Sequence, residues 1–440
     1  MSETSKTLWE EVTLGQLAKG FRGVSYRPEN LLGYASNSAV TLLRATNIQQ
    51  GNLTFDDVQF VPKWLLTPAQ FLATGDIAVC MSNGSKTLVG KCAPYQRSEK
   101  DAYTVGAFCS IFKPVDVTEA EFVFHLFRSQ TYQKNIDVVL AGSAINNLKN
   151  SSVESAVFRI PVEKKHRYKI ATILTSIDTA IEKTEALIAK YQQIKTGLMH
   201  DLFTRGVLPN GQLRPPREQA PELYQETVIG LIPKEWRLMR CADICSRICV
   251  GIVIQPTQYY VDAGVPALRS ANVREDGINP NNFVFISDKS NQLLSKSQLR
   301  AGDIVSVRTG YPGTSSVVPL ELHGANCIDI LISTPTAVVL PYYLCFWINS
   351  SFGKEQVLRQ QGGMAQQHFN VGEMRELLVA LPTLVEQAAI CEKLQLLSQQ
   401  LDVERARREK MQLQKLGLMQ DLLTGKVAVR VDGLVAEIAA

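Results

Sequence analysis

The chain has 440 residues, of which 45% are hydrophobic and 20% are charged, and its net charge is +4. This length is too great for one hydrophobic core and predicts about two to four domains of a globular protein. No apolar run approaches about 18 residues, and the first residues lack the features of a secretory signal, so we expect a cytoplasmic protein without a membrane span. The small net charge does not by itself indicate nucleic-acid binding.

The nine cysteines form no Cys-x-x-Cys pair, and their odd, scattered number fits a reducing cytoplasm. Cys241, Cys245 and Cys249 recur every four residues, a spacing that would place them on one helical face. No nearby histidine or fourth thiol completes a metal site, so we expect buried thiols and no bound metal.

Residues 1–160 form a first variable segment, in which short strand-like runs precede a helix. The runs at 40–48, 76–81 and 107–112 are separated by turn residues, and a helix is predicted over 121–136. Strands followed by helices are typical of an α+β fold.

Two loops of this segment have the composition of a nucleic-acid contact. Residues 81–91 (MSNGSKTLVGK) are small, polar and glycine-rich, which lets the backbone approach a phosphate or a base edge. Residues 141–150 (AGSAINNLKN) contain amides, which suit bidentate contacts to adenine. For any single residue, an ordinary surface turn remains the alternative. Residues 84–91 are no phosphate-binding loop, because five residues separate the glycines and Cys92 replaces the required Ser or Thr.

A long helix is predicted within 161–205, with apolar residues at alternating spacings of four and three. A run of ~35 helical residues spans roughly 50 Å, which is long for a helix that merely covers its own domain, the alternative interpretation. Residues 206–226 are rich in proline and polar residues and indicate a linker.

The second half of the chain repeats this organisation. Residues 227–380 form a second variable segment with a predicted helix over 343–357, and its two polar loops are 307–316 and 361–370. Residues 381–440 contain the second long helix, and the helix ends GLMHDL (197–202) and GLMQDL (417–422) match. LRATNI (43–48) also matches LRSANV (268–273), so the repeat covers the chain and predicts an approximate internal two-fold symmetry.

The same heptad phase in both long helices predicts that they pack against each other as an antiparallel coiled coil. Thr184 and Lys195 complete the spacing in the first helix, as Glu404, Arg408 and Lys415 do in the second. The apolar residues of this predicted seam are Ile170, Leu174, Ile177, Ile181, Ile188, Tyr191, Leu198 and Leu202 in the first helix, and Ile390, Leu394, Leu397, Leu401, Met411, Leu418 and Leu422 in the second.

The sequence contains no motif of a catalytic centre. It lacks GxGxxG, HExxH and GxSxG, as well as the Asn/Asp-Pro-Pro-aromatic tetrapeptide of adenine amino-methyltransferases. This absence favours a recognition module over an enzyme. A fused restriction–modification enzyme or nuclease, and a coiled-coil assembly scaffold without a DNA role, remain alternatives.

Taken together, the two variable segments, the proline-led helices (FRIPVEKKHRYKI and VALPTLVEQAAI) and the run QGGMAQQHFN closely resemble the specificity subunit of type I restriction–modification systems. The resemblance implies two target-recognition domains, each reading one half of an asymmetric bipartite site in double-stranded DNA. The helices would fix the gap, and ~50 Å corresponds to roughly 15 base pairs.

The resemblance also implies partners. Methyltransferase subunits, two of them, and restriction subunits would bind this chain and carry S-adenosylmethionine, ATP and magnesium, whereas this chain would hold no cofactor. The methyltransferase would flip the target adenine out of the stack.

Matched positions in the two halves indicate which residues contact DNA, with arginine reading guanine, amides reading adenine and lysines holding phosphates. Arg44 and Arg269 are shared by both halves, so a purely structural role is the alternative for them. The full set is Arg44, Asn47, Asn83, Ser85, Lys86, Lys91, Asn146 and Asn147 in the first half, and Arg269, Asn272, Arg308, Thr309, Tyr311, Thr314, Gln366 and Gln367 in the second.

Overall fold

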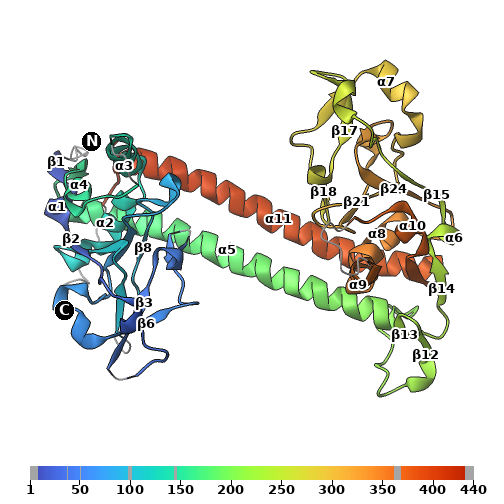
Figure 1. The fold of residues 1–440 in the computed structure, drawn as a ribbon, viewed down its shortest axis with the longest axis horizontal. Coiled ribbons are helices and arrows are strands. Elements are labelled where there is room, and N and C mark those ends of the chain that lie inside the picture. Colours follow the sequence, from blue (N-terminus) through green and yellow to red (C-terminus); the bar gives the residue numbers. More distant parts are fainter. Residues whose placement is uncertain are drawn as a thin grey trace, which may run out of the picture. The chain divides into compact units, whose positions relative to one another are not determined.

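The computed structural model describes residues 8–36, 38–49, 51–97, 102–142, 146–360 and 368–431 (Figure 1). The chain divides into two compact units. The first unit comprises residues 1–185 and 407–440, and the second comprises residues 186–406. Among the described residues, no helix is both long and apolar enough to cross a membrane.

In the first unit, a four-stranded antiparallel sheet has the order β2-β10-β7-β8, and a three-stranded sheet has the order β6-β3-β9. The strands are β2 (Ala18–Arg22), β10 (Cys109–Pro114), β7 (Ile77–Cys80), β8 (Cys92–Pro94), β6 (Gln59–Pro62), β3 (Ala39–Leu43) and β9 (Tyr103–Val105). Further pairs join β1 (Trp9–Thr13) to β11 (Val157–Pro161) and β4 (Ile48–Gln49) to β5 (Asn52–Leu53). The helices are α1 (Leu14–Leu17), α2 (Ala120–Phe127), α3 (Gln130–Ala141) and α4 (Asn150–Glu154).

The second unit repeats this topology. Its sheets have the orders β15-β24-β21-β22 and β16-β20-β17-β23, and β14 pairs with β25 as β1 does with β11. The first sheet and pair comprise β15 (Cys245–Val250), β24 (Ile330–Pro335), β21 (Ile304–Val307), β22 (Ser315–Val317), β14 (Arg237–Arg240) and β25 (Leu378–Leu381). The others are β16 (Tyr260–Val261), β20 (Val284–Ile286), β17 (Val265–Leu268), β23 (Asn326–Cys327), β18 (Val273–Arg274), β19 (Gly277–Ile278), β12 (Tyr224–Thr227) and β13 (Gly230–Pro233). The helices are α6 (Cys241–Ile244), α7 (Asp288–Leu293), α8 (Pro341–Asn349), α9 (Ser351–Gln360) and α10 (Val371–Glu376).

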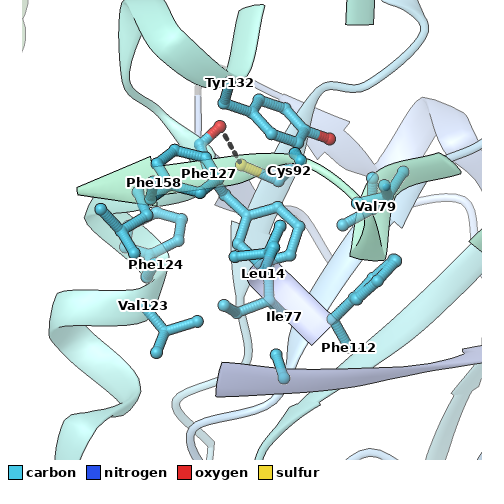
Figure 2. Close-up of a cluster of buried hydrophobic side chains, with 14 of the residues drawn as sticks. Leu14, Ile77, Val79, Cys92, Phe112, Val123, Phe124, Phe127, Tyr132 and Phe158 are labelled. Carbon is cyan, nitrogen blue, oxygen red and sulfur yellow. Dashed lines mark hydrogen bonds between the residues drawn. The ribbon is translucent and has the colours of Figure 1, made fainter. Parts of the chain in front are cut away.

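The central strands of the sheets β2-β10-β7-β8 and β15-β24-β21-β22 are buried on both faces, which explains their nearly uninterrupted apolar sequences. Alternate residues of β7 enter different cores: Ile77 and Val79 pack with α2 and α3, whereas Ala78 and Cys80 pack toward the other sheet. Figure 2 shows the first of these cores, where Cys92 donates a hydrogen bond to the Phe127 carbonyl at 3.6 Å. Burying each leucine- or phenylalanine-sized side chain in this core stabilises the folded state by roughly 1.5–3 kcal/mol.

The helices predicted over 121–136 and 343–357 each divide into two. Ser129 ends the first segment and caps α3, since its hydroxyl accepts a hydrogen bond from the Tyr132 amide at 3.2 Å. In the second unit the break falls at Ser350, between α8 and α9.

The two predicted long helices are present as unbroken elements (Figure 1): α5 (Lys164–Arg205) and α11 (Leu384–Leu423). Glycines with positive φ follow them, Gly206 at +63° and Gly425 at +75°, the conformation that commonly ends a helix. Every residue of the predicted seam is buried or half-buried.

Each unit packs the start of one long helix with the end of the other. In the first unit, Ile170 and Leu174 of α5 share a core with Leu422 of α11. In the second unit, Leu202 of α5 shares a core with Ile390 and Leu394 of α11.

The expected single helical face for Cys241, Cys245 and Cys249 is wrong. Cys241 begins the short helix α6, and the chain becomes strand β15 at Cys245, so the three residues lie on two different elements. Their thiols are free and buried, as expected. Over the described ranges, no group of three or more metal-ligating side chains could hold a metal ion.

Candidate nucleic-acid interface

In the first unit, the structure brings together the two loops singled out in the sequence. Leu148 donates its amide to the Met81 carbonyl at 2.7 Å, and the Asn146 side chain donates to the Gly84 carbonyl at 3.2 Å. The Phe108 carbonyl accepts bonds from the amides of Met81 and Ser82 at 2.8 and 3.1 Å. The loop after β7, the turn before β10 and the segment before α4 therefore form one continuous surface.

Arg22, at the end of β2, ties these segments together. Its Nε donates to the Ala107 carbonyl at 2.7 Å, its Nη1 to the Leu148 carbonyl at 3.1 Å, and its Nη2 to the Asn147 side-chain oxygen at 3.2 Å. A guanidinium suits this position because its donors diverge in one plane. No sequence pattern singled out Arg22.

The corresponding segments of the second unit also meet. Arg308 follows β21, its carbonyl accepts from the Phe369 amide at 2.9 Å, and its Nε donates back to the Phe369 carbonyl at 3.3 Å. Its guanidinium also pairs with Asp329. Thr309 Oγ1 and His368 Nδ1 lie 3.0 Å apart.

The two arginines come from different strands but hold loops at the same edge of the sheet in their respective units. Arg22 comes from β2 and Arg308 follows β21, and these strands flank the equivalent central strands β10 and β24. Continuing the registers Cys80–Cys109 and Val307–Ile330 by one residue places Phe108 and Asp329 at the same point of the fold. Phe108 is 68% exposed in the first unit, whereas the second carries a carboxylate neutralised by Arg308.

The charge on the two surfaces differs as well. In the first unit Lys86 and Lys149 are exposed, and no ion pair among the described residues engages them or Lys91. In the second unit the Arg308 charge is offset by Asp329. The first surface is therefore the better suited of the two to phosphates.

A comparison with protein-family models finds no match. Individual proteins do match over most of the chain. The EcoKI specificity subunit of the type I restriction enzyme from Escherichia coli strain K12 is 27% identical over 406 residues, covering 88% of this chain and 81% of that protein. The chain is a relative of the type I restriction enzyme specificity subunits.

Another specificity subunit, that of the StySPI enzyme from Salmonella potsdam, is 32% identical over 186 residues, which is 42% of this chain and 39% of the relative. The fold agrees with this family. A crystal structure of the specificity subunit from M. genitalium has a TM-score of 0.57 with this chain at 13% identity, covering 96% of this chain and 98% of the other.

In this relative of the specificity subunits, several predicted contact residues lie on the surfaces just described. Asn147, Ser85 and Lys86 are exposed in the first unit, as are Thr309 and Tyr311 in the second. Tyr311 is 84% exposed. Asn83, Lys91, Asn146, Arg308 and Thr314 are half-buried members of the same loops. Gln366 and Gln367 lie outside the described residues.

Four predicted contact residues face their own turns instead. The Asn47 side chain accepts from the Arg44 amide at 2.8 Å and donates to the Asp56 carbonyl at 2.8 Å, and Asn47 is only 2% exposed. Arg44 itself bonds Asp57 at 2.6 Å. Asn272 and Arg269 are placed in the same way, with Arg269 donating to the Asn282 carbonyl at 2.7 Å. This geometry favours the structural alternative for these four residues.

The sequence reasoning did not identify Arg22, Phe108, Asp329 or His368. Phe108 and Asp329 stand at equivalent turns but share no residue type, so matching the two halves could not reveal them. His368 lies in a loop that was predicted, and its proximity to Thr309 depends on the folded path of both loops.

Proposed function

We propose that this chain is the DNA-recognition subunit of a type I restriction–modification enzyme. It directs methyltransferase and ATP-dependent restriction subunits to one DNA site and carries no catalytic centre of its own. The observation that supports this most strongly is the pairing of family similarity along most of the chain with two topologically equivalent units whose surface loops differ.

In this proposal, residues 1–160 and 227–380 are the two target-recognition domains, each reading one half-site. Residues 161–205 and 381–440 hold the spacer helices, which pack as an antiparallel coiled coil, and 206–226 is the linker. The shared cores at both pairs of helix ends support the antiparallel direction. Since the two sets of loops differ, the two half-sites differ and the target is asymmetric.

Within the first unit, Asn83, Asn146 and Asn147 present amides for base edges, and Lys86 and Lys91 hold phosphates. The hydrogen bonds of Arg22 hold the loop after β7, the turn before β10 and the segment before α4 in place. In the second unit, Thr309, Tyr311 and Thr314 face the DNA, and Arg308 acts mainly by positioning its loop. Two methyltransferase subunits, with S-adenosylmethionine, and the restriction subunits, with ATP and magnesium, complete a cytoplasmic complex.

The test is to co-express this chain with its methyltransferase subunit and to map N6-methyladenine in host DNA by single-molecule sequencing. We expect an asymmetric bipartite motif with a fixed gap. A contiguous motif would contradict the two-domain arrangement. A purified complex that contains an active methyltransferase but neither methylates nor binds a specific duplex would favour the assembly scaffold.

A further inference from the structure

Two cysteines face each other beneath the recognition surface of the first unit. Cys80 ends β7, Cys109 begins β10, and the two residues are direct partners in the antiparallel register. They are 0% and 1% exposed.

The backbone pattern shows that this is a non-hydrogen-bonded pair. The amide and carbonyl of Cys80 bond Lys91 and Gly90 on the side of β8, at 2.9 and 2.8 Å. The Cys109 carbonyl accepts from Gly23, on the opposite side, at 2.9 Å. In such pairs the Cα atoms lie about 4.5 Å apart and the side chains approach most closely, which lies within the range of about 4.4–6.8 Å that a disulfide spans.

The chemistry of the two thiols favours reaction. A hydrogen bond from Cys109, assisted by the charge of Lys91, lowers the pKa of Cys80 to about 7, and the same hydrogen bond raises the pKa of Cys109. A thiolate is therefore accessible at neutral pH, and the thiolate is the reactive form.

A cavity borders one residue of the pair. A cavity of about 600 Å³ is lined by Cys109 together with the turn at Gly106, Ala107 and Phe108. This space can hold a small uncharged oxidant next to Cys109, which the oxidant must pass to reach the Cys80 sulfur, since Cys80 does not line the cavity.

The equivalent position of the second unit lacks the pair. Val307 of β21 stands where Cys80 does and is the register partner of Ile330 of β24. Both of these side chains are buried and apolar. The second unit thus provides an internal control, because the two residues at the equivalent position carry no thiol.

We propose that Cys80 and Cys109 are a redox-responsive pair that closes a disulfide between β7 and β10 when the protein meets a hydroperoxide. The Cys80 thiolate attacks one peroxide oxygen and breaks the O–O bond, which gives a sulfenic acid and a hydroxide that takes up the Cys80 proton. The Cys109 sulfur then attacks the Cys80 sulfur and breaks its S–O bond, and hydroxide leaves as water with the Cys109 proton. Two thiols are oxidised, and hydrogen peroxide is reduced to two waters.

The disulfide bears on recognition, a consequence that depends on the proposed function. Met81 follows Cys80 directly and Phe108 precedes Cys109, and these two residues join the loops of the surface. Drawing the two sulfurs into a bond shifts both loop ends, so oxidation weakens discrimination at the half-site read by the first unit alone.

The chemical step is tested on the full chain in complex with its methyltransferase subunit. After hydrogen peroxide treatment, free thiols are alkylated, the protein is digested without reductant and cross-linked peptides are identified by mass spectrometry. We expect one dithiothreitol-reversible link between Cys80 and Cys109, with the loss of two of the nine free thiols. Alkylation of both residues after treatment, or a link to other cysteines, would overturn the proposal.

Matched variants support the assignment. Cys80→Ser and Cys109→Ser should each abolish the link, whereas Cys92→Ser, a buried thiol on the neighbouring β8, should leave it intact. The wild-type peptide map decides the question even where a variant folds poorly.

The consequence for recognition is measured by the binding of oxidised and reduced complex to duplexes changed in one half-site. We expect oxidation to reduce discrimination in the first half-site and to leave the second unchanged. Discrimination that is equal before and after disulfide formation would refute the regulatory role while leaving the chemistry standing. A reduced complex that distinguishes neither half-site would instead refute the proposed function.

Discussion

At the scale of single residues, two arginines hold equivalent surfaces by different routes. Arg22 bonds two carbonyls and one amide from β2, and Arg308 bonds a carbonyl and a carboxylate from the end of β21. The fold therefore determines the point at which the loops must be held. It does not determine which strand supplies the arginine that holds them. This freedom allows the two surfaces to differ while the sheets beneath them stay alike.

Replacing either arginine should affect one half-site only. Arg22→Ala removes three hydrogen bonds that hold the loops of the first unit, and we expect affinity for the first half-site to fall about tenfold, or ~1.4 kcal/mol. Arg308→Ala should do the same for the second. Binding to duplexes changed in one half-site measures both effects, and each unaltered half-site is the control. Equal losses at both half-sites in folded protein would contradict the assignment.

His125 makes the first unit sensitive to acid. It is buried on α2, its Nε2 lies 3.1 Å from Thr175 Oγ1, and burial lowers its pKa from 6.5 to about 4. A lowered histidine pKa means that the unfolded chain binds the proton more readily, so stability is lost as the pH falls below about 6.5. At pH 5 the loss should reach about 2 kcal/mol.

Hydrogen exchange of α2 between pH 7 and pH 5 measures this effect. His125→Gln should remove most of the pH dependence, whereas the exposed His200→Gln should retain it. An unchanged pH dependence in His125→Gln would assign the acid sensitivity to other groups.

At the scale of elements, a buried ionic cluster fixes the first turn of α11 within the second unit. Glu386 pairs with Arg214 and accepts from the Trp236 indole at 3.2 Å and from the Val207 amide at 2.8 Å. Gly206 fits against this cluster, and a Cβ there would lie 2.2 Å from Glu386 Oε1. The end of α5 and the start of α11 are thus joined through one carboxylate.

Glu386→Ala should destabilise the second unit by about 3–5 kcal/mol, because the buried Arg214 guanidinium keeps only one of its two carboxylate partners, Glu235, and the Trp236 indole and Val207 amide lose their acceptor. Glu392→Ala, on an exposed face of the same helix, should change stability by less than ~0.5 kcal/mol. Proteolysis of residues 206–236 and thermal unfolding measure the difference. Equal stability of the two variants would show that the cluster is not needed to hold α11.

At the scale of the whole molecule, the proposed spacer role of α5 and α11 predicts a length rule. Seven extra residues add about 10 Å to a helix, which corresponds to about 3 base pairs. Inserting one heptad both between residues 185 and 186 and between 406 and 407 should lengthen the gap in the methylated motif by that amount. The two half-sites should stay the same.

An insertion into α5 alone serves as the control, because it leaves the two helices unmatched and should impair methylation. Methylome sequencing reads the gap directly. Changed half-sites with an unchanged gap would refute the spacer role.

The sequence predicted the parts of this molecule that repeat along the chain. The long helices followed from their heptads and matched ends, and the polar loops followed from their composition. The tether Arg22 and the pair Cys80–Cys109 could not be predicted, because each depends on strand register between segments far apart in sequence. Asn47 and Asn272 were predicted to contact DNA because they occupy equivalent positions in the two halves of the sequence. They are shared because each stabilises the same type of turn in its own unit.

The division of the chain has a consequence for its synthesis. The second unit is one continuous stretch, residues 186–406, whereas the first unit needs residues from both ends. Met419, Leu422 and Leu423 complete the core around Ile170 and Leu174. On the ribosome, N-terminal domains ordinarily fold first. Here the half that is translated first keeps part of its hydrophobic core exposed until the last helix emerges.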